Sequence, residues 1–186
     1  MSLARVTTVA DAPDRDTWDG HFVPNLSPEQ MIRAGIFGGV YWRRSELADY
    51  HELPGHWLEG LHPGMYCSPT WNASVNKYGV WAGSTQSAWD EAGWMRPQDP
   101  RGWVQWYCRY YMGRRSEDDV RQISRWRNFA SLDQGRWSNI LYGKIRKVNA
   151  DPHDASVSPV IRQSLLHWGY EANDADYAEW RTRKNL

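Results

Sequence analysis

The stretch from Trp94 to Trp137 constrains the fold of this chain most, because its aromatic residues recur with the spacing of an α-helix. Four of them follow the i, i+3, i+4, i+7 pattern and share one helical face: Trp103, Trp106, Tyr107 and Tyr110. Asp99 and Pro100 before them, and Gly113 after them, are residue types that begin and end helices. We therefore predict a helix that Asp99 caps, that ends near Gly113 and whose aromatic face is buried.

A second helix is predicted directly after the first. Ser116 is expected to cap it, with Asp119 three residues on as a short form of the capping box. Its apolar positions, Val120, Ile123 and Trp126, are expected to face inward. The two helices form an aromatic and Arg-rich central unit, around which we predict a compact, mainly α domain with minor β structure.

Shorter elements are predicted on both sides of this unit. A capping box at residues 27–30, with proline in the first turn, predicts a helix that ends at Gly35. The Ser-Pro pair at 158–159 starts a last clear helix that stops at Gly169. The apolar residues 40–42 predict a brief strand.

The length and composition favour one folded domain. With 186 residues, a single core is expected, and we predict a flexible arm over residues 1–20 and one globular domain over residues 21–186. The chain has 13 Trp and 10 Tyr but only 3 Phe, so most core rings carry an N–H or O–H group that needs a partner. There is no apolar run of the roughly 20 residues that span a bilayer, and no signal-peptide pattern. Two cysteines are too few for a disulfide framework. A cytoplasmic protein without membrane association is expected.

Charge is spread unevenly, although 22 basic and 22 acidic side chains sum to zero. Residues 1–93 carry a net charge of −5, residues 94–148 carry +7 and residues 149–186 carry −2. Nine arginines lie between Trp94 and Trp137. Because the planar guanidinium matches phosphate and carboxylate groups, these arginines predict an anion-binding surface. The alternative is that they pair with the acidic flanks inside the fold.

The predicted site residues are polar positions that the apolar pattern leaves unburied. Arg101, Gln105 and Arg109 are spaced by four on the first helix, and Arg121 and Arg125 share a face of the second. The residues expected to contact a ligand are Arg96, Arg101, Gln105, Arg109, Arg114, Arg115, Arg121 and Arg125. Most Trp are expected to be core, with the alternative that one or two line a stacking pocket for a base or an aromatic ligand.

Histidines in the loop-rich residues 43–70 lack the spacing of a metal site. His51 and His56 are five apart with Pro-Gly between them, whereas the helical zinc motif needs two His at i and i+4. His62 and Cys67 leave a loop-built site as an alternative, but we expect neither a metal nor a cofactor. The sequence also lacks the phosphate-loop, dinucleotide-fold and serine-hydrolase motifs.

Four runs of the sequence carry a resemblance. DPRGWVQWYCRYYMGRR, DDVRQISRW, LSPEQMIRAGIFGG and SPVIRQSLLHWGY together cover about half of the chain. They are similar to a widespread, uncharacterised Trp-rich family with a DPRGWxQWYCRYYxGRR core motif. The resemblance supports the domain assignment and implies no activity or residue role.

Three interpretations of function follow from these patterns. The leading one is a protein that binds an anionic ligand, nucleic acid or a nucleotide-like molecule, through the Arg-rich face with aromatic stacking. The second is a small cofactor-independent enzyme that acts on a carboxylate- or phosphate-bearing substrate in a pocket formed by the loops of residues 51–99. The third is a structural or interaction module without a ligand. The sequence carries no signal for a reaction or an oligomeric state.

Overall fold

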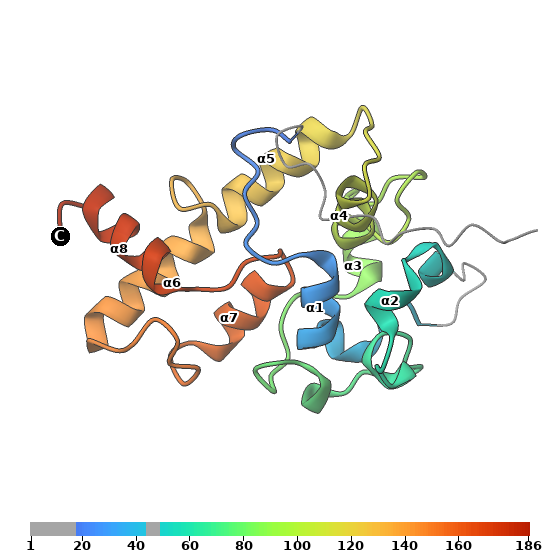
Figure 1. Cartoon of the computed structure of the whole chain (residues 1–186), viewed down its shortest axis with the longest axis horizontal. Helices are drawn as coiled ribbons and strands as arrows, with labels where there is room; N and C mark the ends of the chain where they lie inside the picture. Colours follow the sequence, from blue (N-terminus) through green and yellow to red (C-terminus); the bar gives the residue numbers. More distant parts are fainter. Residues whose placement is uncertain (1–17, 44–48) are drawn as a thin grey trace, which may run out of the picture.

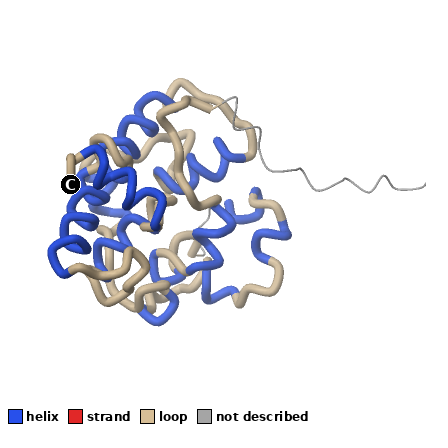
Figure 2. Tube along the Cα trace, turned by 60° about the vertical axis from the view of Figure 1, so that its left-hand side comes forward, coloured by secondary structure: helices blue, strands red, loops and turns tan. Residues whose placement is uncertain are grey.

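The computed structural model describes residues 18–43 and 49–186, and this part of the chain is mainly helical, as predicted. Within it, long loops join the helices and no strand is present (Figure 2). The α-helices are α1 (Pro28–Ala34), α2 (Gly55–Leu58), α3 (Gln86–Glu91), α4 (Trp103–Tyr111), α5 (Asp119–Ala130), α6 (Arg136–Val148), α7 (Pro159–Leu166) and α8 (Asp174–Arg183). Short 3-10 helices are η2 (Phe37–Gly39), η3 (Asp49–Glu52), η4 (Pro63–Met65) and η5 (Ala73–Val75).

Helix α4 begins later than its sequence predicts. Its N-cap is Gly102, and the prediction that Asp99 caps it is wrong. The carboxylate of Asp99 accepts hydrogen bonds from two arginine side chains instead, so it is not available to the helix N–H groups. The helix end is close to the expected place, since Gly113 (φ +98°) follows the last turn and its N–H donates to the carbonyl of Tyr110 (3.0 Å).

Helix α5 also differs at its first turn. Asp118 is its N-cap, not Ser116, because the Ser116 hydroxyl donates to the Asp119 carboxylate (2.8 Å) rather than accepting from the helix. Ile123 and Trp126 are buried as predicted. Val120 was expected to face inward, but it is 80% exposed. The first residue of the helix that is buried is Gln122, so the buried face of α5 does not include Val120.

The flanking elements follow the local signals more closely. Both halves of the capping box between Ser27 and Gln30 form, and α1 ends before Gly35 as predicted. Helix α7 begins after Ser158 but ends at Leu166, before Gly169. Residues 40–42 form a turn and not the expected strand.

Helix α4 lies at the centre of the hydrophobic core. Trp106, Tyr107 and Cys108 are completely buried, and Trp106 packs edge-on against Phe22, with ring centroids 5.5 Å apart. Trp18 falls within the predicted arm but packs in the same core (8% exposed); residues 1–17 of that arm lie outside the described residues.

Many polar atoms of the core rings have partners, although the buried indole N–H groups of Trp42 and Trp103 form no hydrogen bond within the described residues. The indole N–H of Trp106 donates to the Asp119 carboxylate (2.8 Å), and the Tyr107 hydroxyl donates to the Leu26 carbonyl (2.7 Å). The indole N–H of Trp126 donates to the Trp168 carbonyl (2.9 Å). These bonds join α4 to α5 and to the segment before α1, and they join α5 to the end of α7.

The remaining helices surround this centre. Helix α6 packs against α5, α7 and α8, while α1 packs against α2 and α4. Figure 1 shows α6 and α8 towards one end of the molecule and α2 towards the other. No helix among residues 18–43 and 49–186 has the length and apolarity that a membrane crossing requires.

Trp106→Ala is expected to lower the free energy of unfolding by about 3–5 kcal/mol, because it opens a large cavity in the core. Trp106→Phe keeps most of the ring and loses only the bond to Asp119, so it is expected to cost about 1–2 kcal/mol. Urea unfolding monitored by circular dichroism measures both. A loss for Trp106→Ala no larger than for Trp106→Phe would contradict the central position of this ring.

Candidate functional site

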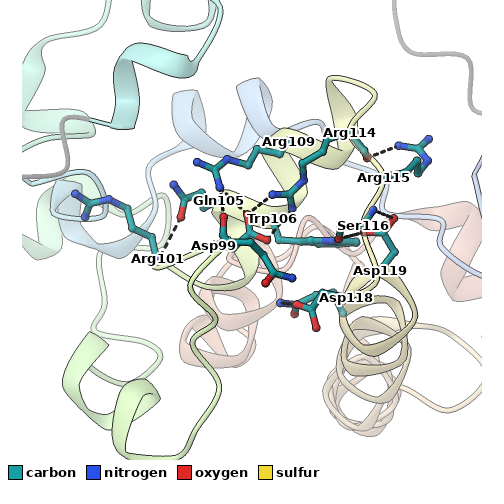
Figure 3. Close-up of polar contacts among 12 residues, drawn as sticks. Asp99, Arg101, Gln105, Trp106, Arg109, Arg114, Arg115, Ser116, Asp118 and Asp119 are labelled. Atoms are coloured by element: carbon teal, nitrogen blue, oxygen red, sulfur yellow. Dashed lines mark hydrogen bonds and ion pairs between the residues drawn. The ribbon is translucent and has the colours of Figure 1, made fainter.

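The buried carboxylate of Asp99 holds two of the predicted site residues. Arg114 donates to both Asp99 oxygens (2.8 and 2.7 Å), and Arg109 donates to one of them (2.9 Å). Arg109 also pairs with Glu52 (2.7 Å). In Figure 3 both guanidinium groups point towards Asp99, whose side chain is completely buried. These two arginines therefore join the segment before α4 to the end of that helix.

Arg101 and Gln105 are also turned into the fold. Arg101 is 2% exposed and donates to the backbone carbonyls of Tyr41 (2.8 Å) and Arg43 (3.4 Å); in Figure 3 its side chain points away from Asp99. Gln105 is completely buried and accepts from the backbone N–H of Arg101 (3.0 Å). The expectation that Arg101 lies unburied is wrong, because carbonyl groups far away in sequence satisfy its guanidinium.

Three further predicted residues differ in their surroundings. Arg121 pairs with Asp118 (2.5 Å), and the guanidinium of Arg115 lies over the Tyr110 ring, 3.9 Å from its centroid. Arg96 is exposed. Their ligand-binding role stays a prediction.

Arg125 is placed differently from the other seven. Its guanidinium carbon lies 5.3 Å from the ring centroids of both Trp94 and Trp168, and one N–H donates to the Gln122 side chain (2.9 Å). Within the described part of the chain no carboxylate forms an ion pair with it. Burial lowers the pKa of Arg125 to about 10, so it is still charged at neutral pH.

Arg125 lines a cavity of about 660 Å³. Six helices (η2, α3, α4, α5, α6 and α7) and the loops between them contribute to its wall. Eight aromatic side chains line it: Phe37, Tyr41, Trp89, Trp94, Trp103, Phe129, Trp137 and Trp168. We call this cavity the aromatic pocket.

The rings of the aromatic pocket form two groups, and each group is drawn from more than one element. Trp168 packs on Trp103 and on Phe129, with centroids 4.8 Å apart in both pairs. Phe37 packs on Tyr41 (5.0 Å) and edge-on against Trp89 (5.4 Å). The wall is therefore built from rings that support each other.

The charged residues of the aromatic pocket are both basic. Arg125 and Arg136 line it, and no Asp or Glu of residues 18–43 and 49–186 does. Arg136 is exposed, lies over the Trp137 ring (5.2 Å) and, like Arg125, has no carboxylate partner among the residues that the structure describes. The pocket therefore combines apolar walls with two guanidinium groups that form no ion pair within the described residues.

His167 is the other titratable ring in the wall besides Tyr41. It is 3% exposed, and burial lowers its pKa to about 3, so the imidazole is neutral at physiological pH. Phe37 stacks on it, with centroids 3.9 Å apart, and the Phe37 backbone N–H donates to its Nε2 (3.1 Å). This bond holds Phe37 at φ +48°, a left-handed conformation that costs a bulky residue about 1–3 kcal/mol.

The loop-built metal site considered for His51, His56, His62 and Cys67 is not found, because no three of these side chains bring their ligand atoms close enough to share an ion. Among the described residues, one group of three possible ligands is close enough, Asp151, His153 and Asp174, whose ligand atoms lie within 4.8 Å of one another. All three are exposed, and such acidic groups commonly occur without an ion.

Comparison with known proteins gives no relative: no family model, curated protein or solved structure matches the chain. The geometry alone therefore supports the candidate site.

Sequence reasoning identified one member of the aromatic pocket, Arg125, and missed its other parts. Trp94 and Trp103 lay in the central stretch, but their spacing did not separate pocket rings from core rings. Phe37 and His167 come from distant segments, and no local sequence pattern indicates that their rings stack or that Phe37 has a positive φ.

Asp99→Asn is expected to lower the free energy of unfolding by about 2–4 kcal/mol, below the usual upper cost of breaking a buried ion pair because both arginines reach solvent. Glu179→Gln is the matched control. It removes an exposed ion pair with Arg183 and is expected to cost at most about 1 kcal/mol. Urea unfolding measures both, and equal losses would contradict a structural role for Asp99.

Proposed function

We propose that this chain binds a small planar aromatic molecule with an anionic group, of the nucleotide-like kind, in the aromatic pocket. The cavity volume of about 660 Å³ is that of a small-molecule site. Indole and phenyl rings stack on planar ligands, and guanidinium groups bind phosphate or carboxylate oxygens through paired N–H donors.

The observation that carries this proposal is the position of Arg125. A buried charge is costly unless an opposite charge or several hydrogen bonds satisfy it. The other arginines of the central helices that face inward pair with carboxylates or carbonyls, whereas Arg125 has one side-chain acceptor, Gln122, and two indole faces. An anionic ligand would supply the charge that the described part of the chain does not.

The charge of the residues in its wall decides which ligands an aromatic pocket binds. Aromatic cages also bind organic cations through the ring faces. Here Arg125 and Arg136 would repel a cation, and no acidic side chain lines the wall to attract one. An anionic ligand is therefore favoured over a cationic one.

Binding is favoured over catalysis, and a small ligand over a long nucleic acid. Nε2 of His167 is already occupied by hydrogen bonds, and its low pKa makes it a poor general base. Arg101, Arg109 and Arg114, which a nucleic-acid backbone would need, are engaged inside the fold.

Calorimetric titration with 1-naphthyl phosphate and with adenosine 5′-monophosphate tests the proposal. Both are expected to bind saturably to the wild-type chain. Arg125→Gln is expected to weaken binding by about 10- to 100-fold, the usual loss for a hydrogen bond to a charged group. Arg127→Gln is the matched control, because it removes one charge from the same helix at a surface pair with Asp133, and binding should change by less than about twofold.

Indole N–H resonances locate the ligand independently. Those of pocket residues such as Trp94 and Trp168 are expected to shift on titration, while those of core residues such as Trp42 and Trp126 stay in place. Saturation by neither probe would overturn the proposal. So would binding that Arg125→Gln leaves unchanged, or tight, salt-sensitive binding of oligonucleotides that does not involve the pocket.

A further inference from the structure

The hydrogen bonds around His167 determine which of its ring nitrogens carries the proton. Nε2 lies 3.1 Å from the backbone nitrogen of Phe37 and 3.1 Å from Nε2 of Gln163. The orientation of the Gln163 amide is fixed, because its oxygen accepts from the Tyr78 N–H (3.0 Å) and its nitrogen donates to the Gly35 carbonyl (3.0 Å). Both neighbours of His167 Nε2 are therefore donors, so Nε2 is the acceptor and the proton is on Nδ1.

Nδ1 of His167 lies beside Gly83, at the wall of the aromatic pocket. His167 and Gly83 both line the cavity, and a Cβ built on Gly83 would lie 3.6 Å from Nδ1. No acceptor among residues 18–43 and 49–186 takes this N–H. His167 is only 3% exposed, and its Nδ1–H donor is therefore a buried group at the wall of a cavity that a ligand can enter.

The ring has no freedom to turn away from this position. Phe37 stacks on it at 3.9 Å with an interplanar angle of 20°, and the two bonds to Nε2 fix its rotation. Because burial keeps the pKa of His167 near 3, the group donates one proton without bringing a charge. A fixed neutral donor of this kind discriminates strongly, because a ligand without an acceptor leaves it unpaired.

We propose that His167 Nδ1–H is a specificity determinant that binds an acceptor atom, a ring nitrogen or a carbonyl oxygen, on the aromatic ring of the ligand. The inference rests on the proposed function and deepens it. The stacking walls select a planar ring, Arg125 selects the anionic group, and His167 selects a heteroaromatic ring over a hydrocarbon one. Heteroaromatic acids and the bases of nucleotides have such acceptors.

Matched ligands test this inference on the wild-type chain. Naphthalene-1-carboxylate has no ring acceptor, and each isomeric quinoline carboxylate replaces one ring C–H by an acceptor nitrogen at nearly constant shape. The isomer whose nitrogen meets Nδ1–H is expected to bind about five- to tenfold more tightly than naphthalene-1-carboxylate. Isomers with the nitrogen elsewhere are expected to bind less tightly than naphthalene-1-carboxylate, because they lose a hydrogen bond to water.

Two variants and one spectrum identify the donor. His167→Phe keeps a ring and removes the N–H. Gly83→Ala keeps His167 but puts a methyl group beside Nδ1, at a φ of +82° that strains an alanine backbone. In either variant the affinity ratio between the preferred quinoline isomer and naphthalene-1-carboxylate is expected to fall to within about twofold of unity. In ¹⁵N-histidine-labelled wild-type chain, the His167 resonances are expected to show the Nδ1–H tautomer and to shift with the quinoline isomer more than with the naphthalene acid.

The outcomes separate this inference from the proposed function. If naphthalene-1-carboxylate binds through Arg125 but no quinoline isomer exceeds it, His167 does not read the ligand and the inference fails alone. A preference that survives both variants, or an Nε2–H tautomer in the spectrum, also overturns it. If none of these acids binds, the inference fails, and the proposed function fails with it when 1-naphthyl phosphate and adenosine 5′-monophosphate do not bind either.

Discussion

The buried carboxylate of Asp99 is the interaction on which the arrangement of the central helices depends. It accepts hydrogen bonds from Arg109, inside α4, and from Arg114, in the turn before α5. It therefore ties the segment that precedes α4 to the last turn of α4 and to the turn between α4 and α5. Trp94 stands at the start of that segment and Arg125 on α5, and the two meet at the aromatic pocket. A change in the position of Asp99 is therefore expected to move Trp94, five residues earlier in the same segment, relative to Arg125.

The arginines of the central stretch divide into two groups by their partners. Arg109, Arg114 and Arg121 pair with carboxylates, and Arg101 bonds to carbonyls, so their charges are compensated within the fold. Arg125 lies on the same helix as Arg121 but one turn later, where it meets indole faces in place of an acidic side chain. Internal pairing, one of the two alternatives that the sequence left open, describes most of these arginines. Anion binding, the other alternative, is a proposal that concerns Arg125.

How much the sequence predicts depends on how far apart the interacting residues lie. The capping box at Ser27 and the helical burial of Trp106 depend on neighbours within four residues, and both were predicted correctly. Asp99 is just as suitable a cap by its residue type and position, yet its carboxylate accepts hydrogen bonds from arginines ten and fifteen residues later. The burial of Arg101 depends on the Tyr41 carbonyl, 60 residues away, and no local pattern encodes it. The aromatic pocket is assembled from still more distant segments, so its members could not be separated from core residues of the same type.

The structure of a complex with 1-naphthyl phosphate would show directly whether Arg125 binds an anion in the aromatic pocket. We expect the naphthyl ring among the rings of the pocket and a phosphate oxygen within about 3 Å of an Arg125 nitrogen, the distance of a charge-assisted hydrogen bond. The ion pairs of Asp99 should be unchanged, because they support the site without touching the ligand. A phosphate bound instead at Arg96 or Arg115 on the surface, with Arg125 still bonded only to Gln122, would contradict the account.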